Sequence, residues 1–432
     1  MKHRIPLALQ VLIGVALGIA LGAVLGKCEL TETLGAIGTL SIKALRALAV
    51  PLVFFAILDA FTKTRIEAKK FGRLMLICLV NVTVAMVIGL TILNVFQPGK
   101  LWQGHLETLI AQTKAKAPEL KKVEDPEAPG ATLELLPNVS YYVPSSLVRP
   151  FVYNNLISVV LLALLTGAAI RRVRAEQEAH GERTIQTVES FIAACYQVLL
   201  VMLEWIVKTV PYAVFGTVAK VVGASGLGVF ALLWVFLLVA LSGLALHSLI
   251  YYPTIAWLWG KKSPKVYLGN GADAILTGLS TNSSLASVPI TLKCLEKMGV
   301  STASARLAAC VGTNLNNDGI TLYEAMAALF LAQALGNNLG LGAQFQIVLA
   351  SIMAGAGIAG IPEAGLIVLP LVLSTAGLSA ETIAVALPLL IPVDWIIARA
   401  RSGVNVMSDM LVAILLDAGQ KSTEPLEPNQ LS

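Results

Sequence analysis

Residues 393–409 read VDWIIARARSGVNVMSD, and they lie inside an apolar segment that runs from about 381 to 417. Four polar side chains share one face of the expected helix: Asp394, Arg401, Asn405 and Asp409. A helix turns by about 100° per residue, which places Arg399 on another face. An arginine near the middle of a bilayer costs about 2.5–3.5 kcal/mol even on lenient scales, so Arg401 must be paired or functional.

Two interpretations of this row differ in what Arg401 contacts. In the simpler one, Arg401 forms a structural ion pair with Asp394. In the functional one, its planar guanidinium grips a substrate carboxylate with two parallel hydrogen bonds. Asn405 and Asp409 would then offer oxygen atoms to a hard cation, together with backbone carbonyls freed where another span unwinds.

Asp318, Glu324 and His247 are further candidates, and each lies within an apolar segment. Asp318 is a second carboxylate of the kind that binds a hard cation. Glu324 is a further candidate, with an ordinary hydrogen-bonded residue on a helix face as the alternative. His247 stands alone in its span, and we expect it to be a helix-packing histidine.

The composition identifies the class of protein. Hydrophobic residues make up 56% of the 432 residues and charged residues 13%, and the mean hydropathy is +0.78. Soluble domains carry about 25% charged residues, so a water-soluble enzyme, a nucleic-acid-binding domain and a disordered chain are excluded. The net charge of +5 does not indicate a nucleic-acid partner, because the basic residues stand at the ends of apolar segments. The five cysteines are far apart, which fits small buried side chains rather than a metal site.

Apolar runs of about 20 residues cross a bilayer as helices. The pattern predicts an all-α membrane protein with eight transmembrane helices and two opposed re-entrant helical hairpins. The helices are expected near 1–26, 40–62, 72–97, 152–170, 186–222, 228–259, 304–335 and 381–417, and the hairpins at 266–298 and 345–375. The placement of Lys and Arg puts both termini on the cytoplasmic side of the cell membrane. Residues 98–150 then form an extracytoplasmic loop, and 418–432 a disordered cytoplasmic tail.

Polar or glycine-rich breaks interrupt the last third of the chain at Ser280–Ser284, Gly312–Gly319 and Gly355–Gly365. Irregular backbone inside the hydrocarbon persists only where it is buried in protein or lines a cavity. Small-residue packing between helices is the alternative explanation, and it suits a single break. Three breaks, in two hairpins and a broken span between them, favour a central binding site. Earlier in the chain, Pro211 predicts a tilt or kink in the long 186–222 segment.

The motifs at these breaks are Ser283-Ser284 with Pro289, Asn316–Gly319 followed by Leu322–Ala325, Ala359–Pro362 with Ala364-Gly365, and Val393–Trp395 leading to Arg401 and Val404–Val406. They resemble the motifs of the dicarboxylate/amino acid:cation symporter family, which includes the glutamate and aspartate transporters. The resemblance covers the whole chain in span order. It implies a homotrimer with an elevator mechanism, in which 1–62 and 150–225 form a fixed scaffold and 70–98 and 228–417 form a mobile transport domain.

The resemblance also implies roles for individual residues. A small organic anion would be bound by Asn282, Ser283, Ser284, Ile320, Ile361, Gly365, Asp394, Ala398, Arg401, Ser402 and Asn405. Na⁺, the coupling ion, would be bound by Gly312, Asn314, Asn316, Asn317, Asp318, Asn405, Asp409 and Thr83. A third sodium ion would lie between the backbone of 314–317 and the second hairpin. Glu324 matches a glutamate thought to carry a proton in animal glutamate transporters, so H⁺ is a second candidate for coupling.

The sequence departs from the family pattern at positions that bear on the substrate. The family aspartate that binds a substrate amino group is Ala398 here, and members that carry C4-dicarboxylates also lack this aspartate. A hydroxyl is lost at Ile320, and the usual methionine is Asn317. The third span lacks the tyrosine of the deeper sodium site, and only Asn81 and Thr83 offer oxygen there.

These observations predict a secondary active symporter that couples entry of Na⁺, or of H⁺, to uptake of a small dicarboxylate or acidic amino acid, with the dicarboxylate favoured. An acidic or neutral amino-acid carrier, with its ammonium held by Asp394 or by hairpin carbonyls, is the alternative within this class. An anion-conducting channel is the alternative from another class. An intramembrane enzyme using Ser284 and His247 is disfavoured, because no third orienting group is evident. A nontransporting receptor with a carrier fold also fits the pattern.

Overall fold

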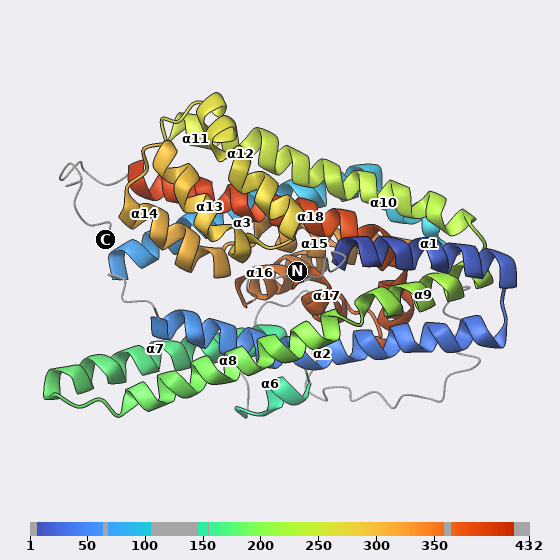
Figure 1. Cartoon of the computed structure of the whole chain (residues 1–432), viewed down its shortest axis with the longest axis horizontal. Coiled ribbons are helices and arrows are strands. Elements are labelled where there is room, and N and C mark those ends of the chain that lie inside the picture. Colours follow the sequence, from blue (N-terminus) through green and yellow to red (C-terminus); the bar gives the residue numbers. More distant parts are fainter. Residues whose placement is uncertain (1–6, 64–67, 105–145, 154, 358–363, 419–432) are drawn as a thin grey trace, which may run out of the picture.

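The computed structural model describes residues 7–63, 68–104, 146–153, 155–357 and 364–418, and within these ranges it contains helices and no strand (Figure 1). The all-α prediction is therefore confirmed for the described residues. Residues 105–145 of the expected outside loop and 419–432 of the expected tail lie outside them.

A first group of helices contains the early and middle segments of the chain. It comprises α1 (Leu7–Leu25), α2 (Glu29–Lys63), α7 (Leu156–His180), α8 (Ile185–Val207) and α9 (Val210–Ser225), preceded at α7 by the short α6 (Arg149–Val152). The long helix α2 contacts α7, α8 and α9, and α1 packs along α9. In Figure 1, α2, α7 and α8 run along the lower side of the molecule.

A second group surrounds the last helix, α18 (Ala380–Ala418). It comprises α3 (Ala68–Phe96), η1 (Pro98–Trp102), α10 (Gly228–Ala245), η2 (Leu246–Tyr251), α11 (Tyr252–Leu258), α12 (Pro264–Thr281), α13 (Ser284–Lys297), α14 (Thr302–Arg306), η3 (Leu307–Val311), η4 (Gly312–Asn314), α15 (Asp318–Ala334), α16 (Leu341–Gly357) and α17 (Ala364–Thr375). The helices α10, α12, α13, α15 and α17 all contact α18. The two groups meet where α16, α17 and α18 pack on α2, α7 and α9. The expected division into a scaffold (1–62 and 150–225) and a transport domain (70–98 and 228–417), and their relative movement, stay predictions.

Glycines bring α1 and α9 into backbone contact. Gly14, Gly18 and Gly22 recur every four residues on one face of α1. A Cβ added to each would lie 2.6–2.7 Å from a backbone oxygen of α9. Such a face, in which small residues let two backbones approach, is typical of helix pairs in membranes. This contact explains why α1 returns to α9, far away in the sequence.

The long 186–222 segment forms two helices rather than one tilted span. The helix α8 ends at Val207, and α9 begins at Val210 with Pro211 in its first turn. Proline lacks the amide N–H that an interior helical position would use, but the first turn of a helix does not need that donor. The expected effect of Pro211 is thus present as a helix boundary.

Long apolar helices occur in both groups. Lys70–Phe96, Ile185–Ile206 and Leu233–Leu258 are each long and apolar enough, by length and composition, to cross a membrane. Shorter apolar helices include Val210–Ala224 and Leu341–Gly355. The expected number of eight transmembrane helices remains a prediction, as does the re-entrant nature of the α12–α13 and α16–α17 pairs.

A substitution tests the glycine contact between α1 and α9. We expect Gly18→Ala to lower the stability by about 1–3 kcal/mol, because the new methyl group would meet the Phe215 carbonyl oxygen at 2.7 Å. Thermal unfolding of the detergent-purified protein measures this change. Gly72→Ala on α3 is the matched control, since a Cβ there meets nothing within 4 Å. Equal melting temperatures for the two variants would contradict the close contact.

Candidate functional site

The polar face of α18 is buried in the second helix group. Asp394, Arg401, Asn405 and Asp409 are each at most 2% exposed. Arg399 lies outside this row: its guanidinium donates to the Trp395 carbonyl oxygen at 2.8 Å and lies over the indole ring of the same residue. The periodicity of the sequence therefore separated the two arginines correctly.

Among the described residues, Arg401 has a hydrogen-bonding partner on one side. Its Nη2 lies 3.3 Å from Oδ2 of Asp394, and its guanidinium carbon lies 4.3 Å from the centre of the Tyr323 ring. Nη1 of Arg401 and Oδ1 of Asp394 have no hydrogen-bond partner among the described residues. The structural ion pair is thus present, and it leaves one donor edge of a buried guanidinium unsatisfied. A buried unpaired donor is costly, which favours a ligand anion at that edge.

Small residues make room around Arg401. A Cβ added to Gly365 of α17 would overlap the guanidinium, and one added to Gly319 of α15 would lie 2.5 Å from the Arg401 carbonyl oxygen. Ala398, one turn earlier on α18, is buried and carries no charge. The described surroundings of Arg401 thus combine a cation with closely packed glycines and an uncharged side chain. Ile361, the remaining residue expected here from the second hairpin, lies outside the described residues.

Hydrogen bonds join the first hairpin turn, between α12 and α13, to this site. Asn282 has a left-handed backbone (φ 53°), and Ser283 caps α13 by accepting a hydrogen bond from the Ala286 N–H. The Ser402 hydroxyl of α18 donates to Oδ1 of Asn282 at 3.1 Å. The Thr313 hydroxyl of the broken span donates to Ser284 Oγ at 3.3 Å. The structure therefore brings the predicted residues of this turn to α18 and to the break.

At the break between η3 and α15, amide and carboxylate side chains lie against the C-terminal half of α18. Here a π-helix is followed by a 3-10 turn, and α15 begins at Asp318. The amide of Asn316 donates to Asp409 Oδ1 at 3.1 Å. The hydroxyl of Ser408 lies 3.0 Å from Asn316 Oδ1 and 2.8 Å from Asp318 Oδ2. The two carboxylates of the expected sodium sites thus share one buried network.

Residues of the sixth apolar segment also reach Asp318. The Tyr252 hydroxyl donates to Asp318 Oδ2 at 2.8 Å, and His247 Nε2 lies 3.5 Å from the same oxygen. The His247 ring is stacked on Tyr251, whose hydroxyl donates to Asn81 at 3.0 Å. From the sequence, His247 was expected to be an isolated helix-packing residue, and this contact was not predicted. The π-helical segment Leu246–Tyr251, a feature often found at functional sites, is visible only in the structure.

Two expected sodium ligands are placed differently or not described. Thr83 is exposed on α3, and its hydroxyl donates to the Leu79 carbonyl oxygen of its own helix. The structure therefore does not bring Thr83 to Asp318; Tyr252 and Ser408 supply hydroxyl groups there instead. The side chain of Asn314 lies outside the described residues.

The hydrogen-bonded network around Asp318 and Asp409 fits a monovalent hard cation. Oδ1 of Asp318 is buried without a partner among the described residues, and a buried carboxylate oxygen of this kind calls for a cation or a proton. The nearby groups are carboxylate, amide and hydroxyl oxygens, which hard cations prefer. Within the described ranges there is no group of three or more His, Cys, Asp or Glu suited to a transition metal. Glu324 is also buried, and neither of its oxygens has a partner among these residues.

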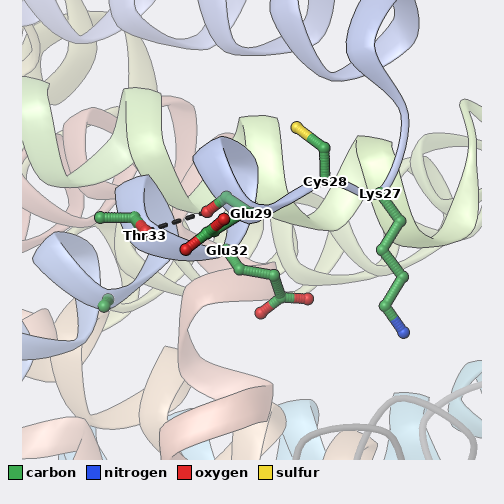
Figure 2. A pocket seen from close by; sticks show the side chains of 6 residues that line it. Lys27, Cys28, Glu29, Glu32 and Thr33 are labelled. Carbon is green, nitrogen blue, oxygen red and sulfur yellow. Dashed lines mark hydrogen bonds between the residues drawn. The ribbon is translucent and has the colours of Figure 1, made fainter.

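The geometry does not support the intramembrane enzyme. His247 faces Asp318, while Ser284 is hydrogen-bonded to Thr313. A separate hollow of about 750 Å³ at the turn between α1 and α2 is lined by Lys27, Cys28, Glu29, Glu32, Thr33 and Ala36 (Figure 2). It shares no residue with the buried polar network, and Glu32 is paired there with Lys220 at 3.0 Å.

Comparison with known proteins confirms the resemblance seen in the sequence. Residues 7–418 match the sodium:dicarboxylate symporter family. An excitatory amino acid transporter of Caenorhabditis elegans is 32% identical over 286 residues, which are 66% of this chain and 54% of the relative. Excitatory amino acid transporter 3 of Mus musculus is 34% identical over 257 residues, 59% of this chain and 47% of the relative. The chain spans about half the length of the curated relatives it matches.

Removal of one hydroxyl tests the network around Asp318. We expect Tyr252→Phe to lower the melting temperature in sodium-free buffer, because a hydrogen bond to a buried carboxylate contributes about 1.5–3 kcal/mol. Addition of Na⁺ should restore part of the loss, since a cation can neutralise the carboxylate in place of the lost donor. Thermal unfolding with and without Na⁺ measures both effects.

Tyr267→Phe is the matched control for this experiment. The Tyr267 hydroxyl is also buried, but it donates to a neutral acceptor, the Met407 carbonyl oxygen, at 2.6 Å. Its loss should be smaller and independent of Na⁺. The same sodium response in both variants would refute a cation-binding role of the Asp318 network.

Proposed function

The chain belongs to the sodium:dicarboxylate symporter family, and from this premise we propose that it is a secondary active symporter for a small dicarboxylate coupled to Na⁺. The family is one of transporters, and the apolar helices fit a multi-pass membrane protein. We place both termini in the cytoplasm. We further propose a homotrimer in which the second helix group moves across the membrane against the first.

The observation that carries the proposal is the half-paired guanidinium of Arg401. Asp394 orients it with one contact at 3.3 Å, and its Nη1 remains without a partner among the described residues. A planar guanidinium with a free donor edge recognises a carboxylate well. Gly365 lies close to Nη1, and any side chain there would overlap the guanidinium. Arg401 would thus bind one carboxylate of the substrate.

The substrate class follows from Ala398. This side chain is 1% exposed and offers no charge to an ammonium group. A substrate ammonium without a carboxylate partner would be desolvated without compensation in this buried site. A dicarboxylate without an amino group avoids this cost, and its second carboxylate would meet the hydroxyl and N–H groups of the first hairpin turn at Ser283 and Ser284.

A specific observation favours a second candidate substrate. Oδ1 of Asp394 is buried and has no partner among the described residues, so it is available to an ammonium group. The relatives named above are excitatory amino acid transporters. An acidic or neutral amino acid held by Asp394 is therefore the alternative. An anion channel is less well supported, because Asp318 and Asp409 lie in a buried network of hydrogen bonds that suits bound cations better than an open anion pore.

Coupling would arise because the ion network and the substrate site share residues. Na⁺ would supply positive charge beside Asp318 and Asp409 and neutralise these buried carboxylates. Asn405 stands between Arg401 and Asp409 on one face of α18, so its orientation affects both sites. Two ligands that stabilise the same arrangement of residues each raise the affinity for the other. Glu324, whose two buried oxygens have no partner in the described part of the chain, is the candidate for proton coupling.

Ligand-dependent stability tests the substrate class directly. Succinate, fumarate, malate, aspartate, glutamate, serine and alanine are added to the detergent-purified protein, each with and without Na⁺. We expect the dicarboxylates to raise the melting temperature only with Na⁺, in proportion to their affinity. Stabilisation by the amino acids instead would overturn the dicarboxylate assignment and favour Asp394 as the ammonium site.

Restoring the missing carboxylate tests the role of position 398. We expect Ala398→Asp to weaken succinate binding at least tenfold, because it places a negative charge beside a dianion, and to create sodium-dependent aspartate binding. Isothermal titration of both ligands in Na⁺ measures this reversal. Ala398→Asn, of similar size and without the charge, is the control. If the unmodified protein already binds aspartate and the variant gains nothing, the proposal is wrong.

A further inference from the structure

Two asparagine side chains connect α15, α18 and α16 through consecutive hydrogen bonds. The Gly319 N–H donates to Asn405 Oδ1 at 2.9 Å. Nδ2 of Asn405 donates to Asn317 Oδ1 at 3.1 Å, and Nδ2 of Asn317 donates to the Gly355 carbonyl oxygen at 2.9 Å. All three bonds are buried. They form a direct connection from the polar face of α18 to the second hairpin arm, α16.

The two ends of this connection fix its direction. A backbone N–H can only donate, and a backbone carbonyl can only accept. Gly319 therefore requires the oxygen of Asn405, and Gly355 requires the nitrogen of Asn317. The remaining amide atoms, Nδ2 of Asn405 and Oδ1 of Asn317, then face each other as donor and acceptor. A flip of either amide would break two buried hydrogen bonds, so the arrangement is determined without observing hydrogen atoms.

Asn317 satisfies a backbone group that the helix α16 leaves open. Gly355 lies in the last turn of α16, where carbonyl oxygens have no partner within a helix. A Cβ added to Gly355 would overlap the Thr321 hydroxyl, so α16 reaches the broken span in close contact. A buried carbonyl oxygen without a donor is costly, and Asn317 removes this cost.

This contact differs from what the family resemblance implies. The resemblance puts a third sodium ion between the backbone of 314–317 and the second hairpin. In this chain an amide N–H already faces the Gly355 carbonyl oxygen at 2.9 Å. This donor already satisfies one lone pair of the Gly355 carbonyl oxygen, so the oxygen does not need a cation as its partner.

We propose that Asn317 is a positioning residue that docks α16 on the binding site without a bound cation and links α16 to Asn405. The role of this link in ligand binding rests on the proposed symport function. Movement of Asn405 on binding of substrate or ion reaches α16 through Asn317. The sodium dependence of the protein then comes from the network of Asp318 and Asp409, and docking of α16 does not require Na⁺.

Hydrogen exchange of the 341–357 peptide tests the proposal, measured by mass spectrometry on the full-length protein in detergent without substrate. In the unmodified protein we expect the same protection of α16 with and without Na⁺. Asn317→Met fills a similar volume but has no amide donor. We expect it to speed exchange of α16 about fivefold in sodium-free buffer, the effect of losing one buried hydrogen bond.

The control is an equivalent amide at the other end of α15. Gln333 is buried, donates to the Leu93 carbonyl oxygen at 2.9 Å and accepts from the Gly99 N–H at 3.2 Å. Gln333→Met should lower the melting temperature yet leave exchange of α16 unchanged. If Asn317→Met does not fold, Asn317→Leu replaces it.

Two results would overturn the proposal. One is equal exchange of α16 in the Asn317 and Gln333 variants. The other is loss of α16 protection in the unmodified protein when Na⁺ is removed. Neither depends on transport, so a failure of the proposed symport function, seen as no sodium-dependent stabilisation by any ligand, is distinguished from a failure of this inference.

Discussion

A row of charged and amide side chains on α18, buried in an apolar body, must find all its partners inside the protein. Arg401 shows the consequence most clearly, because it is 2% exposed and, within the described part of the chain, pairs on one side with Asp394. The neighbouring helices accommodate it with glycines, at Gly319 and Gly365, and with an unwound segment that exposes backbone and amide groups. The break in the seventh apolar segment thus supplies partners that the polar face of α18 needs.

The same requirement joins the ion and substrate regions. Asp409 is joined to Asp318 through the amide of Asn316 and the hydroxyl of Ser408, and Asn405, on the same face of α18, accepts from the Gly319 N–H of α15. Each group is held by a neighbour that also serves another site. A ligand that reorients one of them changes the energy of the rest, which is the physical basis for coupling.

Features encoded along a single helix were predictable from the sequence. The polar face of α18 and the separate direction of Arg399 followed from helical periodicity, and the breaks followed from glycine and polar residues in apolar runs. Contacts between distant segments were not predictable in this way. His247 and Tyr252 reach Asp318 across 71 and 66 residues, and only the packing of α11 and η2 reveals them. Thr83 had the right chemistry, but it lies on the exposed side of α3.

Uptake into sealed proteoliposomes tests the central claim, that Arg401 holds a dicarboxylate whose binding is coupled to Na⁺. Radiolabelled succinate is offered to vesicles with an inward Na⁺ gradient, with the same gradient of choline, and with Arg401→Gln protein. We predict saturable accumulation above the outside concentration with Na⁺ only, and its loss in the folded variant, which lacks the guanidinium. Accumulation of succinate that is independent of Na⁺, or that is retained by Arg401→Gln protein, would contradict it.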